Sequence, residues 1–177
     1  MWVVHAIEVN PPAGAEAVEW LLLTSLPVES FDDAWRVLGY YEKRWLIEEW
    51  HKALKTGCRL ESRQLQSKEG LERIAGLLSV VAVRLLQLKS ATRTDPDRQA
   101  SRVVPLHWIR MLIAARKRLK HSAATTMTIG EFYRELAKLG GLLGRKSDGE
   151  PGWITIWRGW HKLYLLVCGA ELAAELR

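Results

Sequence analysis

The stretch Tyr41–Gly57, YEKRWLIEEWHKALKTG, alternates apolar residues with acidic and basic ones. If it forms one α-helix, which advances about 100° per residue, five polar side chains share an arc of about 80°. They are Tyr41, Arg44, Glu48, Lys52 and Lys55. The opposite side of the helix carries Leu46, Ile47, Trp50, Ala53 and Leu54. We therefore expect a helix that buries one face and presents a mixed-charge stripe on the other.

The sequence around this stretch predicts where the helix begins and ends. Ser30 is a typical N-cap residue, and Asp32 and Asp33 follow it in the first turn, where acidic side chains interact favourably with the helix dipole. Gly57 is a typical C-terminal stop. The predicted helix therefore runs from about Ser30 to Thr56.

Two short strands precede this helix. Residues 2–9 and 18–24 are rich in apolar and β-branched side chains, and the cluster NPPAG between them favours a turn. We expect an antiparallel pair. Two strands alone make a poor sheet, so the pattern indicates that this chain forms part of a larger fold.

The rest of the chain is predicted to be helical. Residues 69–88 carry apolar side chains nearly all the way round, which is typical of a helix buried between layers. The polar segment 90–102, SATRTDPDRQASR, is a candidate boundary. Beyond it, the predicted helices cover residues 105–120, 128–139 (ending at Gly140-Gly141) and 153–176.

Charge is unevenly distributed along the sequence. The 177 residues carry a formal charge of +6, and the segment from Arg84 to Lys120 holds ten Lys or Arg against two Asp. A basic segment of this kind is either a solvated face or a contact for nucleic acid, and the sequence leaves both open.

Cysteine spacing and hydropathy argue against several classes of protein. Cys58 and Cys168 are far apart, so neither a zinc site nor a disulfide framework is indicated, and a reducing, cytoplasmic setting fits best. The first ten residues have no basic region typical of a signal peptide. The most apolar stretch, residues 71–88, is interrupted by Arg73 and Arg84, so we expect no membrane span.

The polar stripe has the spacing of a known signature. Tyr41-x2-Arg44-x3-Glu48-x6-Lys55 resembles the YREK signature of bacterial insertion-sequence transposases of the DDE class, in particular the insertion-sequence-four group. Flanking segments resemble the same family, and they are EWLLLTSLPVES, LERIAGLLSVVAVRLLQLK, LAKLGG and ITIWRGWHKL. Four spaced residues inside matching flanks are more specific than an isolated motif.

The resemblance implies roles for individual residues. Glu48 would be the last acid of an Asp-Asp-Glu triad and a ligand of Mg²⁺ or Mn²⁺ in a ribonuclease-H-like (integrase-like) α/β fold. Arg44, Lys55 and Tyr41 would contact DNA at the transposon ends, and Lys52 also matches a lysine of the family helix. Without its neighbours, Glu48 would be taken for an ordinary solvated side chain.

Trp20 has two interpretations. In the family, a tryptophan at this place stacks on a base flipped out of the transposon end, and such stacking is worth about 1–3 kcal/mol per base. In the strand pattern VEWLLLT, however, Trp20 alternates with Val18 and Leu22 as a core aromatic residue does. The sequence does not separate these alternatives.

One departure from the family limits the expected activity. A two-metal site needs more than one carboxylate, and no aspartate of this chain lies in a strand context that matches the two missing acids. Residues 1–92 thus resemble the last part of a transposase catalytic domain, mostly helical with two strands, and residues 93–177 resemble the helical dimerisation region. We expect no strand transfer by this chain alone.

The carboxy-terminal aromatic residues also have two interpretations. Trp153, Trp157, Trp160 and Tyr164 lie on one face of a helix. They belong either to the core of the chain, which the pattern favours, or to the family's dimer contact. The expected partners are transposon-end double-stranded DNA and a second chain, in a homodimer or in a heterodimer with an intact transposase. The alternatives to a transposase remnant are a non-catalytic DNA-binding or dimerising module that inhibits the intact enzyme, and a helical interaction protein.

Overall fold

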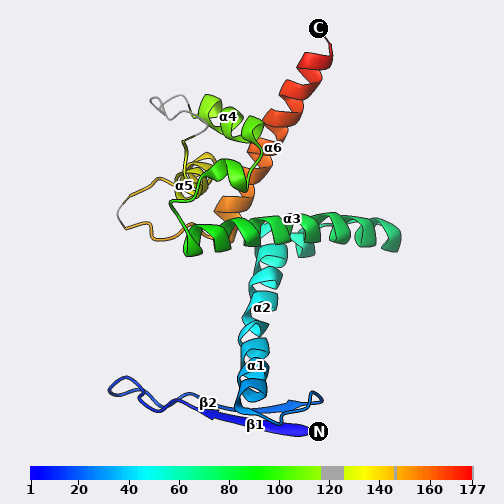
Figure 1. The fold of residues 1–177 in the computed structure, drawn as a ribbon. Coiled ribbons are helices and arrows are strands. Elements are labelled where there is room, and N and C mark those ends of the chain that lie inside the picture. Colours follow the sequence, from blue (N-terminus) through cyan, green and yellow to red (C-terminus); the bar gives the residue numbers. More distant parts are fainter. Residues whose placement is uncertain (117–125, 146, 177) are drawn as a thin grey trace. The chain divides into compact units, whose positions relative to one another are not determined.

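The computed structural model describes residues 1–116, 126–145 and 147–176. By its internal contacts the chain divides into two units, Met1–Glu48 and Glu49–Arg177, and each is described by itself. In the described residues, two strands are followed by helices, so the prediction of a mostly helical chain with two N-terminal strands is confirmed (Figure 1). The ribonuclease-H-like classification stays a prediction, and so does the domain boundary at residues 92 and 93.

Unit 1 contains a two-stranded antiparallel sheet. Strands β1 (Trp2–Ile7) and β2 (Glu19–Thr24) pair as predicted, with Val4 opposite Leu22. Both of these side chains are buried, together with Val37 of the following helix. The alternation of buried and exposed residues along the strands follows from the two-residue period of a β-strand, which leaves the outer face of this sheet exposed.

Helix α1 (Phe31–Glu42) begins where the sequence predicts. The Ser30 hydroxyl oxygen accepts a hydrogen bond from the Asp33 N–H (3.2 Å), and the Asp33 carboxylate accepts one from the Ser30 N–H (3.1 Å). This capping box satisfies two backbone donors that the helix leaves open. Hydrogen bonds from the Ser30 hydroxyl and from backbone N–H groups hold the pKa of Asp33 below its ordinary value.

The prediction of one uninterrupted helix up to Thr56 is wrong. α1 ends at Glu42, α2 covers Arg44–Lys52, and a π-helical turn, η1, covers Ala53–Gly57. In this turn the Cys58 N–H donates to the Ala53 carbonyl oxygen at 2.8 Å. Ala53, Leu54 and Gly57 of this turn are buried.

The prediction of a buried face along residues 41–57 is only partly correct. No residue of α2 is buried, and Leu46 and Ile47 are 53% and 60% exposed. Ala53 and Leu54 of η1 are buried as predicted, in a small cluster that also contains Cys58 and Leu78. Amphipathic periodicity therefore identified this stretch as helical but overestimated how much of its apolar face is buried.

Unit 2 is built on the long helix α3 (Lys68–Thr94), which follows the short 3₁₀ turn η2 (Leu60–Ser62). α3 extends beyond the predicted end at residue 88. The prediction that it is buried between layers is wrong, because Leu77 and Val80 are 66% and 64% exposed. Its buried residues lie along one face: Leu78, Ala82, Leu85 and Leu88.

Three further helices and the 3₁₀ turn η3 (Ala100–Arg102) complete the described part of unit 2. They are α4 (Leu106–Ala115), α5 (Ile129–Leu139) and α6 (Trp153–Glu175). Thr128 and Glu131 form a capping box at the start of α5. The predicted continuation of the α4 helix beyond residue 116 lies outside the described residues. The main core joins side chains from α3, α4, α5 and α6, with Phe132 and Leu163 fully buried.

Two glycines allow α5 and α6 to pack closely. A Cβ placed on Gly159 would overlap the carbonyl oxygen of Leu136, and a Cβ on Gly140 would overlap that of Thr155. Only glycine leaves room for the backbones to approach in this way. The crossing therefore fixes the position of α6 within unit 2.

The length and composition of α3 allow a membrane-spanning interpretation that the sequence had not favoured. α3 is long and apolar enough to cross a bilayer by these criteria, and 22% of its most apolar window is buried in the structure. Core helices of water-soluble proteins meet the same criteria, so this finding is weak support for a span. The expectation of no membrane span stays a prediction.

Candidate functional site

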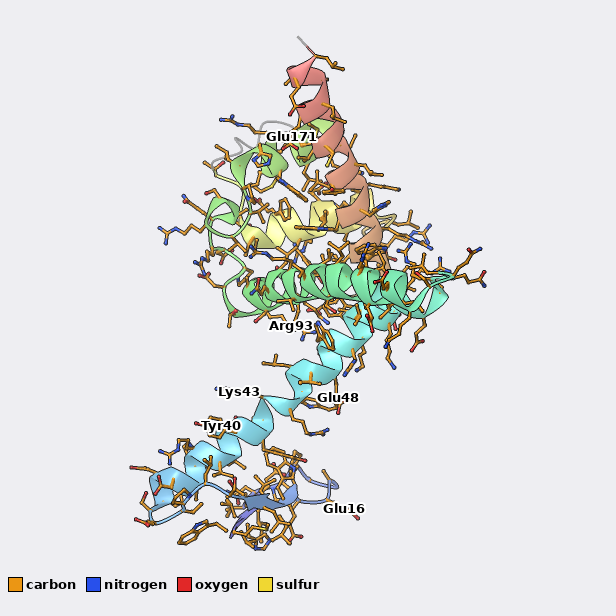
Figure 2. The ribbon with its side chains drawn as sticks, turned by 90° about the vertical axis from the view of Figure 1, so that its right-hand side faces the viewer. Glu16, Tyr40, Lys43, Glu48, Arg93 and Glu171 are labelled. Atoms are coloured by element: carbon orange, nitrogen blue, oxygen red, sulfur yellow. The ribbon has the colours of Figure 1, made fainter. Side chains whose placement is uncertain are left out.

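Three residues of the predicted signature meet in unit 1. The Arg44 guanidinium donates from Nη1 to Oε1 of Glu48 at 2.7 Å, one helical turn away. The same guanidinium lies over the ring of Tyr41, 5.5 Å from its centroid. Figure 2 shows Glu48 on α2 with its side chain projecting from the ribbon. The carboxylate and the cation of the predicted stripe are therefore neighbours on an exposed surface.

Two tryptophans complete this cluster. Trp20 of β2 packs edge-on against Tyr41, with ring centroids 4.9 Å apart. Trp45 also lies near Arg44, whose guanidinium is 5.7 Å from the Trp45 ring centroid. A hollow of about 260 Å³ is lined by Trp20, Tyr41, Arg44, Trp45 and Glu42. Aromatic rings beside a guanidinium provide a surface on which a planar group such as a nucleobase can stack, while the guanidinium binds a neighbouring anion.

The structure gives Trp20 a partial place in the core. Its ring packs against the buried side chains of unit 1, yet the residue is only partly buried and also lines the hollow. Both interpretations of Trp20 are thus compatible with its position, and its DNA contact stays a prediction.

Glu48 by itself does not make a metal site. Its side chain is 39% exposed and is engaged by Arg44, which neutralises the carboxylate. Among the residues that the structure describes, no group of three or more His, Cys, Asp or Glu side chains could hold a metal ion. Mg²⁺ and Mn²⁺ require several oxygen ligands, so the donors that the described residues supply do not fit a metal-ion pair.

Lys52 and Lys55 belong to unit 2. Lys52 Nζ lies 3.8 Å from Glu49, and Lys55 Nζ lies 3.2 Å from Glu61, both at exposed positions. Lys55 is on the π-helical turn, so its predicted angular position, which assumed about 100° per residue, does not apply. Their proposed DNA contacts remain predictions that the structure does not test.

Glu49, next in sequence to Glu48, has a different environment. Its carboxylate accepts a hydrogen bond from Lys89 Nζ at 2.9 Å, and Lys89 in turn lies over the Trp153 ring, 4.4 Å from its centroid. The hydrogen bond from Lys89 holds the pKa of Glu49 below its ordinary value. This part of the polar sequence therefore serves to attach the start of unit 2 to α3.

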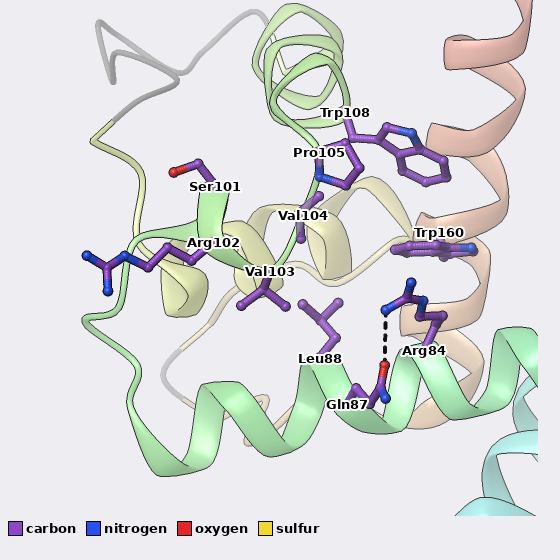
Figure 3. A pocket seen from close by; sticks show the side chains of 10 residues that line it. All are labelled: Arg84, Gln87, Leu88, Ser101, Arg102, Val103, Val104, Pro105, Trp108 and Trp160. Carbon is purple, nitrogen blue, oxygen red and sulfur yellow. Dashed lines mark hydrogen bonds between the residues drawn. The ribbon is translucent and has the colours of Figure 1, made fainter.

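The aromatic residues of α6 belong mostly to the core of unit 2. Trp153, Trp157 and Trp160 are partly buried against the main core, as the pattern favours, whereas Tyr164 is 49% exposed. Trp160 also packs against Trp108 of α4, with centroids 4.7 Å apart. These two rings border a hollow of about 380 Å³, in which Arg84 donates to Gln87 at 3.2 Å (Figure 3).

α6 carries two separate apolar stripes. The buried one consists of Ile156, Gly159, Leu163 and Val167. The second consists of Leu165, Leu172 and Leu176, which are 54%, 61% and 89% exposed. Their spacing of seven and four residues places them on one face of the helix. An exposed stripe of this kind is typical of a helix that packs against another chain.

A family model described as the transposase Tn5 dimerisation domain matches residues 80–176, more than half of the chain. The protein belongs to this family. The matched region runs from within α3 to the end of α6. The part of the prediction that concerns a transposase with a dimerisation region is thereby confirmed, and self-association is the role of this domain. The signature residues lie before the matched region.

The sequence-based interpretation missed two sets of residues. Trp45 was not singled out, although it follows Arg44 directly and lies four residues after Tyr41, a spacing that places two rings on one side of a helix. The exposed stripe of α6 was also missed. Its signal was the heptad-like spacing of Leu165, Leu172 and Leu176.

Proposed function

We propose that this protein is a transposase-derived dimer that binds the DNA of transposon ends, with α6 joining two chains and the cluster of Trp20, Tyr41 and Arg44 contacting DNA. The observation that carries the proposal is the match to a transposase dimerisation domain, whose last helix presents an apolar stripe on the surface. A cytoplasmic, DNA-associated location follows from such a role.

The α6 stripe supports the dimer part of the proposal. Leu165 and Leu172 lie one heptad apart and expose more than half of their surface to solvent. Burying such side chains against a second α6 would remove them from water, at about 25 cal/mol per Å² of apolar surface. Gly169 lies between them on the exposed side of the helix and would allow two helices to approach.

The cluster in unit 1 supports the DNA part. A phosphate that approaches Arg44 can replace the Glu48 carboxylate as the acceptor, because a guanidinium binds either group through the same donors. Tyr41 and Trp45 keep the guanidinium in place. Trp20 would then stack on a base next to that phosphate. Lys52 and Lys55 would contact further phosphates.

Glu48 is proposed as one carboxylate of an Asp-Asp-Glu site that this chain does not complete. Mg²⁺ or Mn²⁺ would bind Glu48 only together with carboxylates that the described residues do not supply, so we expect no DNA cleavage by the chain alone. The contribution of the chain to transposition is then binding and pairing rather than chemistry.

The dimer is tested by the variant Leu165→Asp/Leu172→Asp. Two carboxylates on the exposed stripe would be buried without partners in a helix pair, so the variant is expected to be monomeric at concentrations where the unchanged protein is a dimer. Analytical ultracentrifugation measures this. Leu77→Asp/Val80→Asp on the exposed side of α3 is the matched control and should leave the dimer intact. An unchanged dimer in the α6 variant would refute the proposed interface.

DNA binding is tested by Arg44→Ala. Loss of one phosphate contact should weaken binding to a duplex DNA and reduce the slope of log K against log salt concentration by about 1. The matched control is Lys68→Ala, which removes a cation whose side chain is 89% exposed on α3. Fluorescence anisotropy titrations measure both. Equal effects of the two variants would contradict a specific role for Arg44.

A second candidate function is inhibition of an intact transposase through mixed dimers. It is favoured by the combination of an exposed α6 stripe with the lack of a metal-binding cluster among the described residues. Co-expression with an intact transposase of the same family should then lower its transposition frequency, and Leu165→Asp/Leu172→Asp should abolish that effect. A transposition frequency that does not change on co-expression would contradict it.

A further inference from the structure

Unit 2 contains a large basic hollow that neither the proposed dimer contact nor the proposed DNA contact of unit 1 uses. It has a volume of about 990 Å³ and lies between the carboxy-terminal part of α3, α5 and the loop that joins α5 to α6. Figure 1 shows this loop passing near the end of α3. Five cationic residues line the hollow: Lys89, Arg93, Arg134, Lys138 and Arg145. Two acidic residues, Asp148 and Glu150, also line it.

Three of these cations already have carboxylate partners. Lys89 donates to Glu49 at 2.9 Å, and Lys138 donates to the buried Glu135 at 2.6 Å. Arg93 pairs with Glu150 at 3.2 Å, where both side chains are mostly exposed. Exposed pairs contribute little, typically below about 1 kcal/mol, so Arg93 can change partner at small cost.

Arg134 and Arg145 differ from these three. Both are exposed, and neither side chain is paired with a carboxylate among the described residues. The nearest acid in sequence to Arg145 is Asp148, whose carboxylate accepts a hydrogen bond from the Arg145 backbone N–H at 2.9 Å. That acid is thus engaged by the loop backbone, and both guanidinium groups can bind an anion.

The loop that joins α5 to α6 also lines the hollow with glycine residues. Gly144 and Gly149 have φ of +76° and +62°, a conformation that favours glycine. The Lys138 side chain lies against Gly144, whereas no atom lies within 4 Å of the position that a Cβ on Gly149 would take. Backbone N–H groups in such turns contribute to anion binding.

We propose that this hollow is a second binding site for the phosphodiester backbone of duplex DNA, with Arg134 and Arg145 as the principal phosphate ligands and Arg93 joining them when it leaves Glu150. The cations come from three separate segments, α3, α5 and the α5–α6 loop. That spread suits several successive phosphates better than a single small anion. The dimerisation domain would then bind DNA as well as a second chain.

The test is a titration of the full-length protein with a short mixed-sequence duplex DNA, measured by fluorescence anisotropy at several salt concentrations. Arg134→Gln/Arg145→Gln should weaken binding about tenfold near 0.1 M salt and reduce the slope of log K against log salt concentration by about 2. The matched control is Arg110→Gln/Arg158→Gln, which removes the same charge at exposed positions outside the hollow. Equal losses in the two double variants would show a general charge effect and overturn the proposal.

A second variant tests the proposal in the opposite direction. Glu150→Gln frees Arg93 and removes a negative charge from the hollow, so it should strengthen DNA binding about two- to threefold. Glu175→Gln, near the end of α6, is the matched control and should have no effect. Unchanged or weaker binding in Glu150→Gln would overturn the role of Arg93.

Parallel measurements separate this site from the proposed function. If the hollow variant loses affinity while Arg44→Ala does not, the hollow is a DNA site and the proposed contact in unit 1 fails. If only Arg44→Ala loses affinity, the hollow proposal fails. If Arg134→Gln/Arg145→Gln retains DNA affinity but is monomeric in the ultracentrifuge, the hollow is a protein interface, which also overturns the proposal.

Discussion

Arg44 Nη1 and Glu48 Oε1 lie 2.7 Å apart on successive turns of α2, at an exposed position. This ion pair holds the guanidinium beside the rings of Tyr41 and Trp45 before any ligand arrives. It also means that a DNA phosphate must compete with the Glu48 carboxylate for Arg44. The residue that the family resemblance assigns to catalysis is therefore, in this chain, the internal partner of a proposed DNA ligand.

The first prediction is that Glu48→Gln strengthens DNA binding. Removing the competing carboxylate frees Arg44, so affinity for duplex DNA should rise about two- to fivefold at low salt. The free energy of unfolding should change by less than about 0.5 kcal/mol, since an exposed pair at this spacing stabilises little. Anisotropy titration and thermal melting measure the two effects. Glu16→Gln removes an exposed acid in the same unit and serves as the control. Weaker binding in Glu48→Gln would contradict the competition.

The second prediction concerns acid stability through Glu49. Its pKa is lowered in the folded protein by the hydrogen bond from Lys89, from a starting value of 4.5. Its contribution to stability is thus present above this value and is lost as the pH falls through the lowered pKa. Glu49→Gln should lower the free energy of unfolding by about 1–2 kcal/mol at neutral pH. The difference from the unchanged protein should shrink in acid.

Urea unfolding at a series of pH values measures this dependence. Glu42→Gln, an exposed acid at the end of α1, is the control, and its effect on stability should be small at every pH. If the difference between Glu49→Gln and the unchanged protein were constant from neutral pH to acid, the Lys89 hydrogen bond would not be its source.

The third prediction concerns the crossing of α5 and α6. Gly159→Ala should destabilise the protein by at least about 2–3 kcal/mol, because the new Cβ would overlap the Leu136 carbonyl oxygen and push the helices apart. Gly76→Ala on α3 is the matched control, since its Cβ would meet nothing within 4 Å. That substitution should be neutral or stabilise by up to about 1 kcal/mol. Chemical denaturation measures both, and similar effects of the two substitutions would contradict the close crossing.

The fourth prediction concerns the two thiols. Cys58 is fully buried, and burial raises its pKa to about 11, so it holds almost no reactive thiolate near neutral pH. Cys168 on α6 is only partly buried. A disulfide reagent such as DTNB should modify Cys168 rapidly in the folded protein and Cys58 only after unfolding. Cys168→Ser should remove the rapid phase. Rapid modification of Cys58 in the folded protein would show that its cluster opens readily.

Local features of the sequence predicted local features of the structure well. Ser30 and Thr128 begin helices where the sequence predicts, because each offers a side-chain oxygen to a free backbone N–H of the first turn. The two strands pair antiparallel as the apolar runs and the intervening turn suggest. The proximity of Arg44 and Glu48 was also predictable, since it depends only on helical spacing.

Predictions that required knowledge of distant neighbours were less successful. The periodicity of residues 41–57 did not reveal the interruption at Lys43 or the π-helical turn, in which Ala53 and Leu54 are buried against α3. The apolar surface of α3 suggested burial between layers, yet α5 and η1 pack against only part of it. An apolar helix face predicts that burial of that face is favourable. It does not predict whether another segment of the same chain covers it.

The sequence by itself determined where the two strands and the helices other than α2 begin, which residues of a regular helix share a face, and the resemblance to transposases, because these depend on spacing along the chain. Only the tertiary structure decided that α6 has a buried stripe and an exposed one, that Gly140 and Gly159 let two helices touch, and that Arg134 and Arg145 line one hollow. The physical reason is that side chains far apart in sequence meet only through packing, and the energy of packing depends on all the surfaces that come together.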